Sequence, residues 1–246
     1  MNDADRSIER LAQIISYAQS LVVLTGAGVS AASGVPTFRG TGGLWREHRP
    51  EELATPQAFA ADPELVWEFY NWRRDLISRV EPNPAHEAIA ALEDRFKDFV
   101  LITQNVDGLH RLAGSRRMLE LHGCIWRTRC TDCDYITEDR SPLQGLPRCP
   151  DCNGMLRPDV VWFNEPVTQI QEAARLAAQA DVMLVAGTSA VVQPAAGLAL
   201  VTREAGGKVA VVNLEPTPLS GMADVALHGP ADEILPRVVS LLRDMD

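Results

Sequence analysis

Residues 21–40, LVVLTGAGVSAASGVPTFRG, constrain the fold of this chain more than any other segment. Residues 21–24 form a short apolar run of the kind that builds a strand buried on both faces of a parallel sheet. Gly26, Gly28 and Ala31 follow at G-x-G-x-x-[GA] spacing. In that fingerprint the first glycine makes a tight turn, the second lets the backbone approach a pyrophosphate, and the third lets a helix pack on the strand. Backbone N–H groups and the helix N-terminus are then expected to face phosphates. A purely structural strand-to-helix turn fits the same pattern.

The residues after this turn argue against hydride transfer. A dinucleotide-binding dehydrogenase continues into a second strand that ends in an acidic residue about 20 positions on. Here residues 36–43 read PTFRGTGG, which is too rich in glycine and proline to form that strand. Glu47 and Glu51 therefore do not qualify as the ribose ligand.

The rest of the chain alternates between helical and strand patterns. Ile8, Leu11, Ile15 and Ala18 recur at helical spacing after Ser7, which is expected to cap that helix. Further helices are expected at 84–96, 165–180, 194–205 and from 232, and further strands at 99–102, 118–121, 181–186 and 208–214. This alternation predicts an α/β fold with a Rossmann-like, doubly wound parallel sheet, whose ligands lie beyond the carboxyl ends of the strands.

Two segments depart from this rhythm. Between residues 45 and 72 the aromatic residues are concentrated, and Pro50, Pro56 and Pro63 punctuate the chain. This predicts an insertion of short helices. The second segment contains two cysteine pairs, which are Cys130-x-x-Cys133 and, fifteen residues later, Cys149-x-x-Cys152. The spacing is typical of a four-cysteine zinc ribbon, in which the closed tetrahedral site makes zinc structural. Cys124 lies outside the pattern and is expected to be a small core or cleft residue.

Polar residues follow four expected strands. Gln104, Asn105 and Asp107 come just after the strand at 99–102, as ligands for a ribose or as an ordinary helix cap. His122 follows the strand at 118–121, either as a structural imidazole or as a general base for a ribose hydroxyl. The other four histidines lack such a place. The last two strands end in Gly187-Thr188-Ser189 and Asn213-Leu214-Glu215. Together with the glycine loop, these ends predict a nucleotide pocket.

Charge and composition limit the partners. The formal net charge of −10 argues against nucleic acid as the main partner. No apolar run reaches the length of a membrane span, and the polar N-terminus lacks the apolar region of a signal peptide, so a cytoplasmic location is expected. We expect a monomer by default.

The motifs together resemble those of sirtuins, the NAD-dependent protein-lysine deacylases. GAGVSAASGVPTFRG, TQNVDGLH, LHG, the paired CxxC motifs, GTS and NLE occur in the order found in that family. The resemblance implies an NAD-binding domain at 1–40, 98–123 and 157–246, and a small domain made of a helical insertion at 41–97 and a zinc ribbon at 124–156. The resemblance also implies that an acylated lysine of a protein substrate enters the cleft between them. In the family, the acyl oxygen attacks the anomeric carbon of the nicotinamide ribose, and the expected products are lysine, nicotinamide and acyl-ADP-ribose.

The resemblance also assigns residues. His122 is implied as the base, and Asn105 as a second catalytic residue. Gln104, Asn105 and Asp107 are implied to bind the nicotinamide ribose and carboxamide. The other implied cofactor contacts are Gly26, Ala27, Gly28, Ser30, Phe38, Arg39, Trp45, Gly187, Thr188, Ser189, Asn213, Leu214, Glu215 and Ala231. In segment 160–165, Val161 and Phe163 are implied to pair with the substrate peptide, although a core strand fits the same pattern.

Within the family, the chain most resembles the class that removes succinyl and malonyl groups, so these are the preferred acyl groups that the resemblance implies, with acetyl removed as well. Tyr70 and Arg73 match that class's Tyr-x-x-Arg, and Ala54 matches a position that it keeps small. A guanidinium and a phenol on one helix face suit a carboxylate. Two alternatives remain: a sirtuin-like protein mono-ADP-ribosyltransferase, and a non-catalytic sensor of NAD or ADP-ribose.

Overall fold

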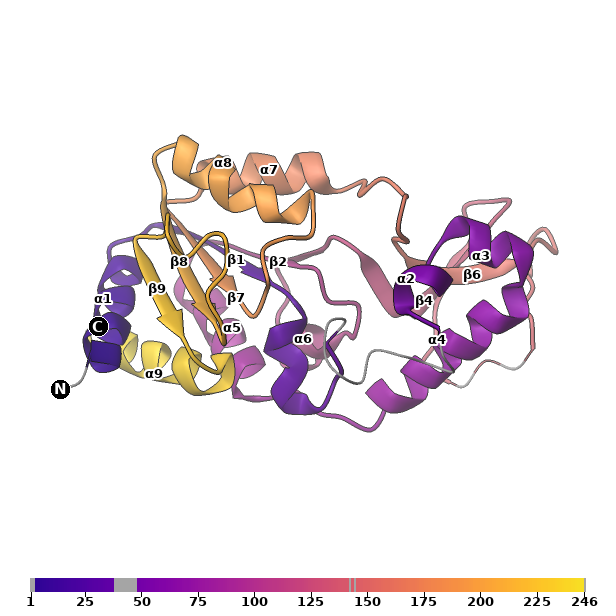
Figure 1. Ribbon diagram of the computed structural model, residues 1–246, viewed down its shortest axis with the longest axis horizontal. Coiled ribbons are helices and arrows are strands. Elements are labelled where there is room, and N and C mark those ends of the chain that lie inside the picture. The colour runs from indigo at the N-terminus through magenta and orange to yellow at the C-terminus, as the bar shows by residue number, and fades with distance from the viewer. Residues whose placement is uncertain (1–2, 38–47, 142, 144, 246) are drawn as a thin grey trace.

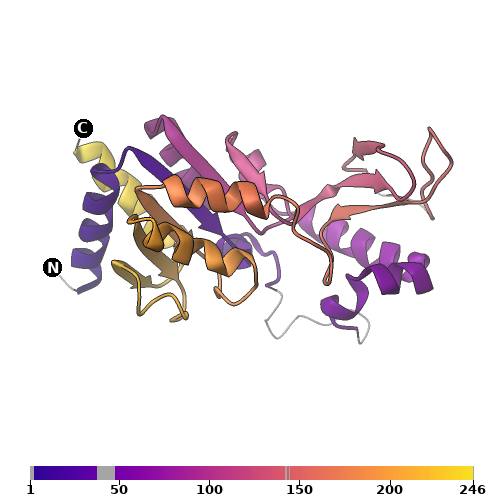
Figure 2. The ribbon, with the colours of Figure 1, turned by 90° about the horizontal axis from the view of Figure 1, so that it is seen from above.

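The computed structural model describes residues 3–37, 48–141, 143 and 145–245. The ribbon divides into a larger part built on a twisted sheet and a smaller part that carries α2, α3, α4, β4 and β6 (Figure 1). The view from above shows the same division (Figure 2).

The described residues of the larger part form a six-stranded sheet in which every neighbouring pair is parallel. Its strands are β1 (Ser20–Thr25), β2 (Asp98–Thr103), β3 (Met118–Glu120), β7 (Val182–Ala186), β8 (Lys208–Asn213) and β9 (Val225–His228). They lie in the order β3-β2-β1-β7-β8-β9, the strand order of a Rossmann fold. The order reverses between β1 and β7, where the glycine loop begins. The predicted doubly wound sheet is confirmed.

Helices cover both faces of this sheet because its central strands are apolar on both sides. Leu21 and Val23 pack toward α1 (Asp3–Ser16), α5 (Pro84–Arg95) and α9 (Ala231–Asp244). Val22 and Leu24 pack on the opposite face, toward α7 (Ile170–Gln179), the 3₁₀ turn η2 (Ala195–Gly197) and α8 (Leu198–Glu204).

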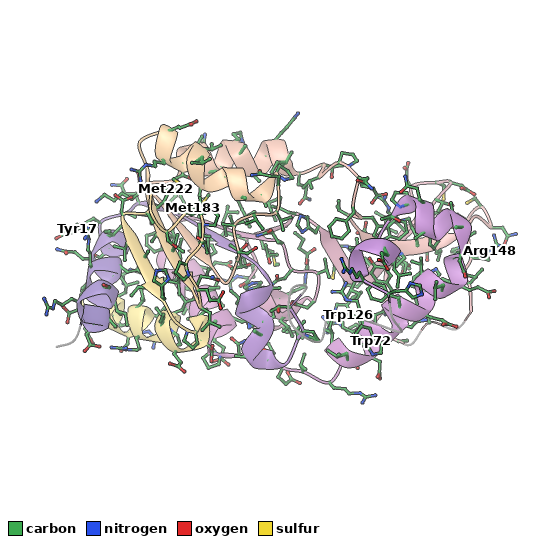
Figure 3. The ribbon with its side chains drawn as sticks, in the orientation of Figure 1. Tyr17, Trp72, Trp126, Arg148, Met183 and Met222 are labelled. Atoms are coloured by element: carbon green, nitrogen blue, oxygen red, sulfur yellow. The ribbon has the colours of Figure 1, made fainter. Side chains whose placement is uncertain are left out.

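The smaller part combines helices and a second sheet around its own core. Three of its helices begin at a proline: α2 (Pro50–Leu53), α3 (Pro56–Ala61) and α4 (Pro63–Ile77). Proline suits that position because it has no N–H to leave unpaired. Antiparallel strands β5 (Ile136–Glu138), β4 (Gly123–Cys130) and β6 (Leu156–Val160) form the sheet, in that order. The predicted insertion of short helices is therefore present, and its Trp67, Phe69 and Tyr70 are buried in this core. Trp72 and Trp126 also lie in this part (Figure 3).

Two sequence predictions about elements are wrong, and one strand was missed. Ser7 does not cap the first helix, because α1 already begins at Asp3. The glycine loop leads into a 3₁₀ helix, η1 (Ala27–Ser33), and not into an α-helix. Strand β9 was not predicted, since its four residues, Val225–His228, are too few to show a pattern.

Two of the expected domain boundaries also need correction. Helix α5, placed in the insertion at 41–97, packs its buried residues Ala88, Ile89 and Leu92 in the core shared with α1 and α9. Strand β6, most of which was placed in the NAD-binding domain, pairs with β4 in the small sheet. In the part of the chain that the structure describes, no helix combines the length and the apolar character that crossing a bilayer requires.

Candidate active site

The glycine loop packs directly against the end of strand β7. The N–H of Gly28 donates to the carbonyl of Gly187 at 2.7 Å, and the N–H of Gly26 donates to that of Ala186 at 3.2 Å. A Cβ on Gly28 would lie 2.7 Å from the Gly187 oxygen, while Gly187 itself has φ +58° and leaves 2.3 Å between an added Cβ and the Val29 nitrogen. The close approach that excludes a side chain at Gly28 is therefore to Gly187. Among the backbone N–H groups that were expected to face phosphates, that of Gly28 already has an internal partner, because the Gly187 carbonyl accepts it.

Behind the loop, Ser30 sits at the centre of a buried hydrogen-bond network. Its hydroxyl donates to the Asp107 carboxylate at 2.8 Å and accepts from the Asn105 amide at 3.2 Å. Because the N–H of Asn83 donates to Nδ1 of His86, Nε2 carries the His86 proton and donates to Ser30 at 3.2 Å. The network thus joins η1, α5 and the β2 loop, and it fixes Asn105 and Asp107 in place.

The environment of this network alters the protonation of its members. Burial lowers the pKa of His86 to about 4. Burial also raises the pKa of Asp107, against the hydrogen bonds from Leu109 and Ser30. Sequence reasoning missed His86. The signal was its position three residues after Asn83, where the two side chains form a capping box at the start of α5.

Asn105 and Gln104 face the glycine loop from the end of β2. The Asn105 amide also donates to the Gly26 carbonyl at 3.1 Å. The Gln104 amide donates to the Thr188 hydroxyl at 3.2 Å. Strands β1, β2 and β7 are therefore joined at their carboxyl ends, as the sequence led us to expect for a nucleotide pocket.

His122 follows β3 and its ring is oriented by the backbone. Its Nδ1 lies 3.1 Å from the Gln104 carbonyl oxygen. Since a carbonyl oxygen only accepts, Nδ1 carries the proton in this contact and the lone pair is on Nε2. Burial lowers the His122 pKa, while the hydrogen bond to Gln104 opposes the change. The imidazole is thus held neutral with one nitrogen free to accept a proton.

The ends of β8 and β9 lie at the same edge of the sheet. Ser189, Leu214 and Glu215 are exposed there, and Asn213 donates its amide to the Glu215 carbonyl at 2.8 Å. His228, which was expected to lie away from any strand end, is the last residue of β9 and pairs in register with Asn213. Ala231 is buried at the start of α9.

Four thiols form a cluster that fits a metal ion. The Sγ atoms of Cys130, Cys133, Cys149 and Cys152 lie within 4.8 Å of one another, and three of the separations are 3.5, 3.6 and 3.5 Å. A tetrahedral zinc ion with bonds of about 2.3 Å needs sulfur atoms about 3.8 Å apart. The four thiols therefore fit zinc and leave no open coordination position. Cys124 is buried outside the cluster, and burial raises its pKa to about 11, as befits a core residue.

Tyr70 and Arg73 lie on the same face of α4. The Arg73 guanidinium carbon is 6.0 Å from the centre of the Tyr70 ring. Tyr70 is completely buried, and its hydroxyl accepts the indole N–H of Trp162 at 2.9 Å. Burial lowers the pKa of Arg73, although the electrostatic interactions with Tyr70 and Asp107 act to raise it.

Arg74 is not the solvated charge that a basic pair on a helix suggests. It is buried, donates to the carbonyls of Asp139 and Ser141, and lies 5.3 Å from the Trp126 ring. The neighbouring arginines therefore have different environments.

The segment after β6 is not a strand. Strand β6 ends at Val160, and Asn164 adopts a left-handed conformation with φ +70°. The N–H of Val161 donates to the His122 carbonyl and that of Phe163 to the Ala54 carbonyl, each at 2.9 Å. These two N–H groups are consequently not available for pairing with a peptide. The Phe163 side chain is exposed.

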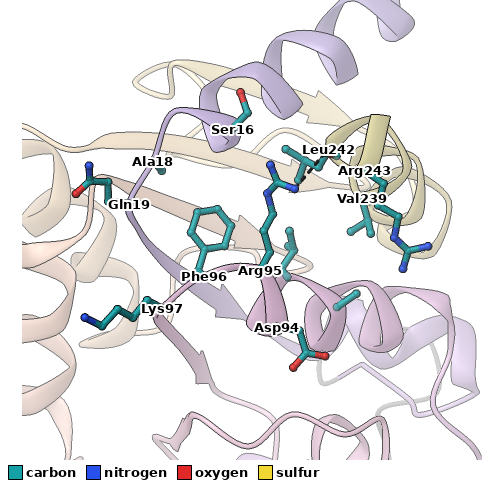
Figure 4. A pocket seen from close by; sticks show the side chains of 12 residues that line it. Ser16, Ala18, Gln19, Asp94, Arg95, Phe96, Lys97, Val239, Leu242 and Arg243 are labelled. Carbon is teal, nitrogen blue, oxygen red and sulfur yellow. Dashed lines mark hydrogen bonds between the residues drawn. The ribbon is translucent and has the colours of Figure 1, made fainter. Parts of the chain in front are cut away.

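Some expected contacts lie elsewhere or outside the description. Phe38, Arg39 and Trp45 fall outside the described residues. A pocket of about 660 Å³ lies where α1, α5 and α9 end, and its lining includes Arg95, Lys97 and Arg243 (Figure 4). None of the expected site residues lines it.

Comparison with known proteins matches this geometry to one family. Residues 26–194 match the Sir2 family. The chain is 51% identical to an NAD-dependent protein deacylase 2 of Pyrobaculum aerophilum over 93% of each chain, and 49% identical to an NAD-dependent protein deacylase 1 of Archaeoglobus fulgidus over 96% of this chain and 98% of that one. It superposes on a Sir2 homologue in complex with NAD with a TM-score of 0.92, at 49% identity over 96% and 94% of the two chains. A Sir2 complex with a p53 peptide and NAD⁺ gives a TM-score of 0.85, at 32% identity over 97% and 99%.

Proposed function

The chain belongs to the Sir2 family and is an NAD-dependent protein-lysine deacylase, and we propose that it prefers lysines carrying acidic acyl groups such as succinyl and malonyl. The acyl group is transferred to ADP-ribose, with release of nicotinamide. The observation that carries the proposed preference is the pair of Tyr70 and Arg73 on one face of α4.

We propose that His122 is the general base. Nε2 has the lone pair, since Nδ1–H is directed to the Gln104 carbonyl, so a ribose hydroxyl of the co-substrate can give its proton to Nε2. The lowered pKa keeps this nitrogen unprotonated near neutral pH. The backbone contact from Val161 to the His122 carbonyl holds the base from the other side.

We propose that the co-substrate contacts the glycine loop and the strand ends that surround it. Asn105 and Asp107 are held by Ser30, which keeps an amide and a carboxyl group at the nicotinamide end without rearrangement on binding. We propose that Gly26, Ala27 and Gly28 contact the co-substrate. Phe38, Arg39 and Trp45 remain predicted contacts, because they fall outside the described residues. Gln104, Gly187 and Thr188 border the ribose. Ser189, Asn213, Leu214, Glu215 and Ala231 are proposed for the adenosine end.

The four-cysteine cluster is proposed to hold one zinc ion with a structural role. Zinc stabilises the small sheet when bound, because its ligands come from both ends of the loop that carries β5. The substrate peptide is proposed to lie beside residues 161–163. Since the N–H groups of Val161 and Phe163 have internal partners, carbonyl oxygens and the exposed Phe163 ring are the groups that remain for the peptide.

The proposed acyl site joins a cation, a phenol and a small residue. Arg73 supplies a guanidinium that fits a carboxylate with two parallel hydrogen bonds. Ala54 is buried in the same core cluster as Tyr70, and its small side chain leaves room for a longer acyl chain. The partial burial of Arg73 strengthens its attraction for a carboxylate, because less water screens the charge.

One assay tests this function. The protein is incubated with NAD and peptides of one sequence that carry succinyl-, malonyl- or acetyl-lysine, and deacylated peptide, nicotinamide and labelled protein are measured. We expect deacylation with nicotinamide release and a higher kcat/KM for the acidic acyl groups. Equal or better removal of acetyl would contradict the preference. ADP-ribosylated protein would indicate the transferase alternative, and binding of NAD without turnover would indicate the sensor.

A further inference from the structure

Trp162 links the proposed acyl site to the core of the smaller part. Its indole Nε1 lies 2.9 Å from the Tyr70 hydroxyl oxygen, and both side chains are buried. An indole nitrogen only donates a hydrogen bond, so the Tyr70 oxygen must be the acceptor. The direction of this bond therefore needs no assumption about hydrogen positions.

This hydrogen bond restricts the orientation of the Tyr70 hydroxyl proton. A phenol carries one hydrogen, and with an acceptor position of the oxygen taken by Trp162 that hydrogen must be directed elsewhere. Arg73 cannot take it, because a guanidinium has no acceptor. Among the described residues, no side chain or carbonyl accepts from Tyr70 within hydrogen-bond distance. The hydroxyl is thus left as an oriented donor in a buried site.

Trp162 is itself held on several sides. Its ring packs 5.2 Å from the Phe59 ring at an angle of 46°, and the Arg157 guanidinium carbon lies 3.3 Å from its ring centre. Arg157 donates two hydrogen bonds to Glu165, and Glu165 also accepts the backbone N–H of Trp162 at 2.8 Å. Burial works to raise the pKa of Glu165, yet these hydrogen bonds leave it lowered, so the ion pair persists. One ion pair therefore holds both the backbone and the ring of Trp162.

We propose that Trp162 is a positioning residue for acidic acyl groups: its indole N–H holds the Tyr70 hydroxyl so that the phenolic proton is donated to the distal carboxylate of the substrate. This inference rests on the proposed acidic-acyl preference. A phenylalanine at this position keeps an aromatic ring, but it is smaller and has no N–H, so it would leave the Tyr70 hydroxyl free to rotate. Acetyl-lysine has no distal carboxylate and does not use the oriented proton.

A double-mutant cycle tests the proposal. The variants are Trp162→Phe, Tyr70→Phe and the double variant, and the readout is the ratio of kcat/KM on succinyl-lysine to that on acetyl-lysine in one peptide. We expect Trp162→Phe to lower the ratio about three- to tenfold, the value of one hydrogen bond. Tyr70→Phe should lower it at least as much. In the Tyr70→Phe background, Trp162→Phe should have no further effect on the ratio, because it acts only through the hydroxyl.

Trp67→Phe is the matched control. Trp67 is another buried tryptophan of the same core cluster, and its indole donates its hydrogen bond to the Leu156 carbonyl at 3.0 Å and not to Tyr70. This variant should lose stability and keep the ratio. If Trp162→Phe does not fold, 3-benzothienylalanine at position 162 replaces the N–H by sulfur at nearly constant shape and takes its place in the cycle.

Each outcome is decisive. A wild type that does not prefer succinyl-lysine overturns both the proposed preference and this inference. A wild type with the preference, combined with an unchanged ratio in Trp162→Phe, overturns only the role of Trp162. Additive effects of the two substitutions do the same, since they show that Trp162 acts independently of the Tyr70 hydroxyl. If Trp162→Phe lowers the succinyl-to-acetyl ratio in the wild-type background but not in the Tyr70→Phe background, the proposal is supported.

Discussion

Val161 donates its backbone N–H to the carbonyl oxygen of His122 at 2.9 Å. Two residues on, the N–H of Phe163 donates to the carbonyl of Ala54 at the same distance, and between them Trp162 donates to Tyr70. Three consecutive residues therefore connect the proposed base, the acyl helix and the small residue of the acyl site. Movement of this segment would alter the base and the acyl pocket together.

Gly28→Ala should destabilise the fold. The added Cβ would lie 2.7 Å from the Gly187 oxygen and 2.9 Å from its Cα, and because these are backbone atoms there is little room to relax. We expect a loss of about 1–3 kcal/mol in the free energy of unfolding, measured by urea denaturation. Gly221→Ala is the control, because an added Cβ there meets nothing within 4 Å. Equal stability of the two variants would show that the loop does not pack on Gly187 in this way.

His122→Ala should lower kcat/KM by about 10²- to 10⁴-fold if Nε2 is the general base, while NAD affinity changes little. The wild-type rate should also fall on the acid side, because the base must be unprotonated and is lost as pH falls through its pKa. Since burial lowers this pKa, the midpoint of the acid limb in kcat/KM should lie below 6.5. A variant that keeps most of its activity, or a midpoint above 6.5, would exclude this role.

His86→Gln should make stability less dependent on pH. The His86 pKa is about 4 in the folded protein and 6.5 in the unfolded chain. Between these values only the unfolded chain binds the proton. The contribution of His86 to the free energy of unfolding is therefore complete above pH 6.5 and is lost as pH falls toward 4. The difference corresponds to about 3 kcal/mol.

The measurement is urea denaturation of wild type and variant at pH 7 and pH 4.5. His110, which is buried beside His86 and whose pKa burial also lowers, acts in the same direction, so the variant should keep part of the dependence. Parallel curves for the two proteins would contradict the buried neutral state of His86.

Cys130→Ala should abolish zinc binding and unfold the small sheet, since folding of such a site is coupled to the metal. Zinc content measured by elemental analysis and protease cleavage between residues 131 and 155 report the two effects. Cys124→Ala removes the one cysteine outside the cluster and should keep zinc and protease resistance. A zinc-free protein that remains folded and active would refute the structural role.

The sheet was predictable because each central strand is an uninterrupted apolar run between turn signals. Strand β9 was missed because its four residues carry too little pattern, and the packing of η1 against Gly187 was missed because it joins positions far apart in the chain. The zinc cysteines were predictable because they are closely spaced along the chain. The contact of Trp162 with Tyr70 was not, because it joins positions 92 residues apart. Single-sequence patterns do not report such pairs.

Arg73→Met should remove the proposed preference for acidic acyl groups. Removing one partner of a desolvated charge pair costs about 2–5 kcal/mol, so kcat/KM on a succinyl-lysine peptide should fall by roughly thirty- to several-thousand-fold. Methionine keeps much of the length of the side chain and lacks the charge. Acetyl-lysine makes no contact with this guanidinium and should be affected far less. Steady-state rates on the two peptides give the ratio directly.

Arg74→Met provides the comparison, because the two arginines are adjacent on α4 and differ in what they contact. Arg74 donates to backbone carbonyls of Asp139 and Ser141 and lies against Trp126. Its loss should therefore lower the melting temperature and affect both acyl substrates alike, with the succinyl-to-acetyl ratio preserved. A ratio that changes in Arg74→Met as much as in Arg73→Met would mean that general loosening of α4, and not a contact with the substrate carboxylate, sets the preference.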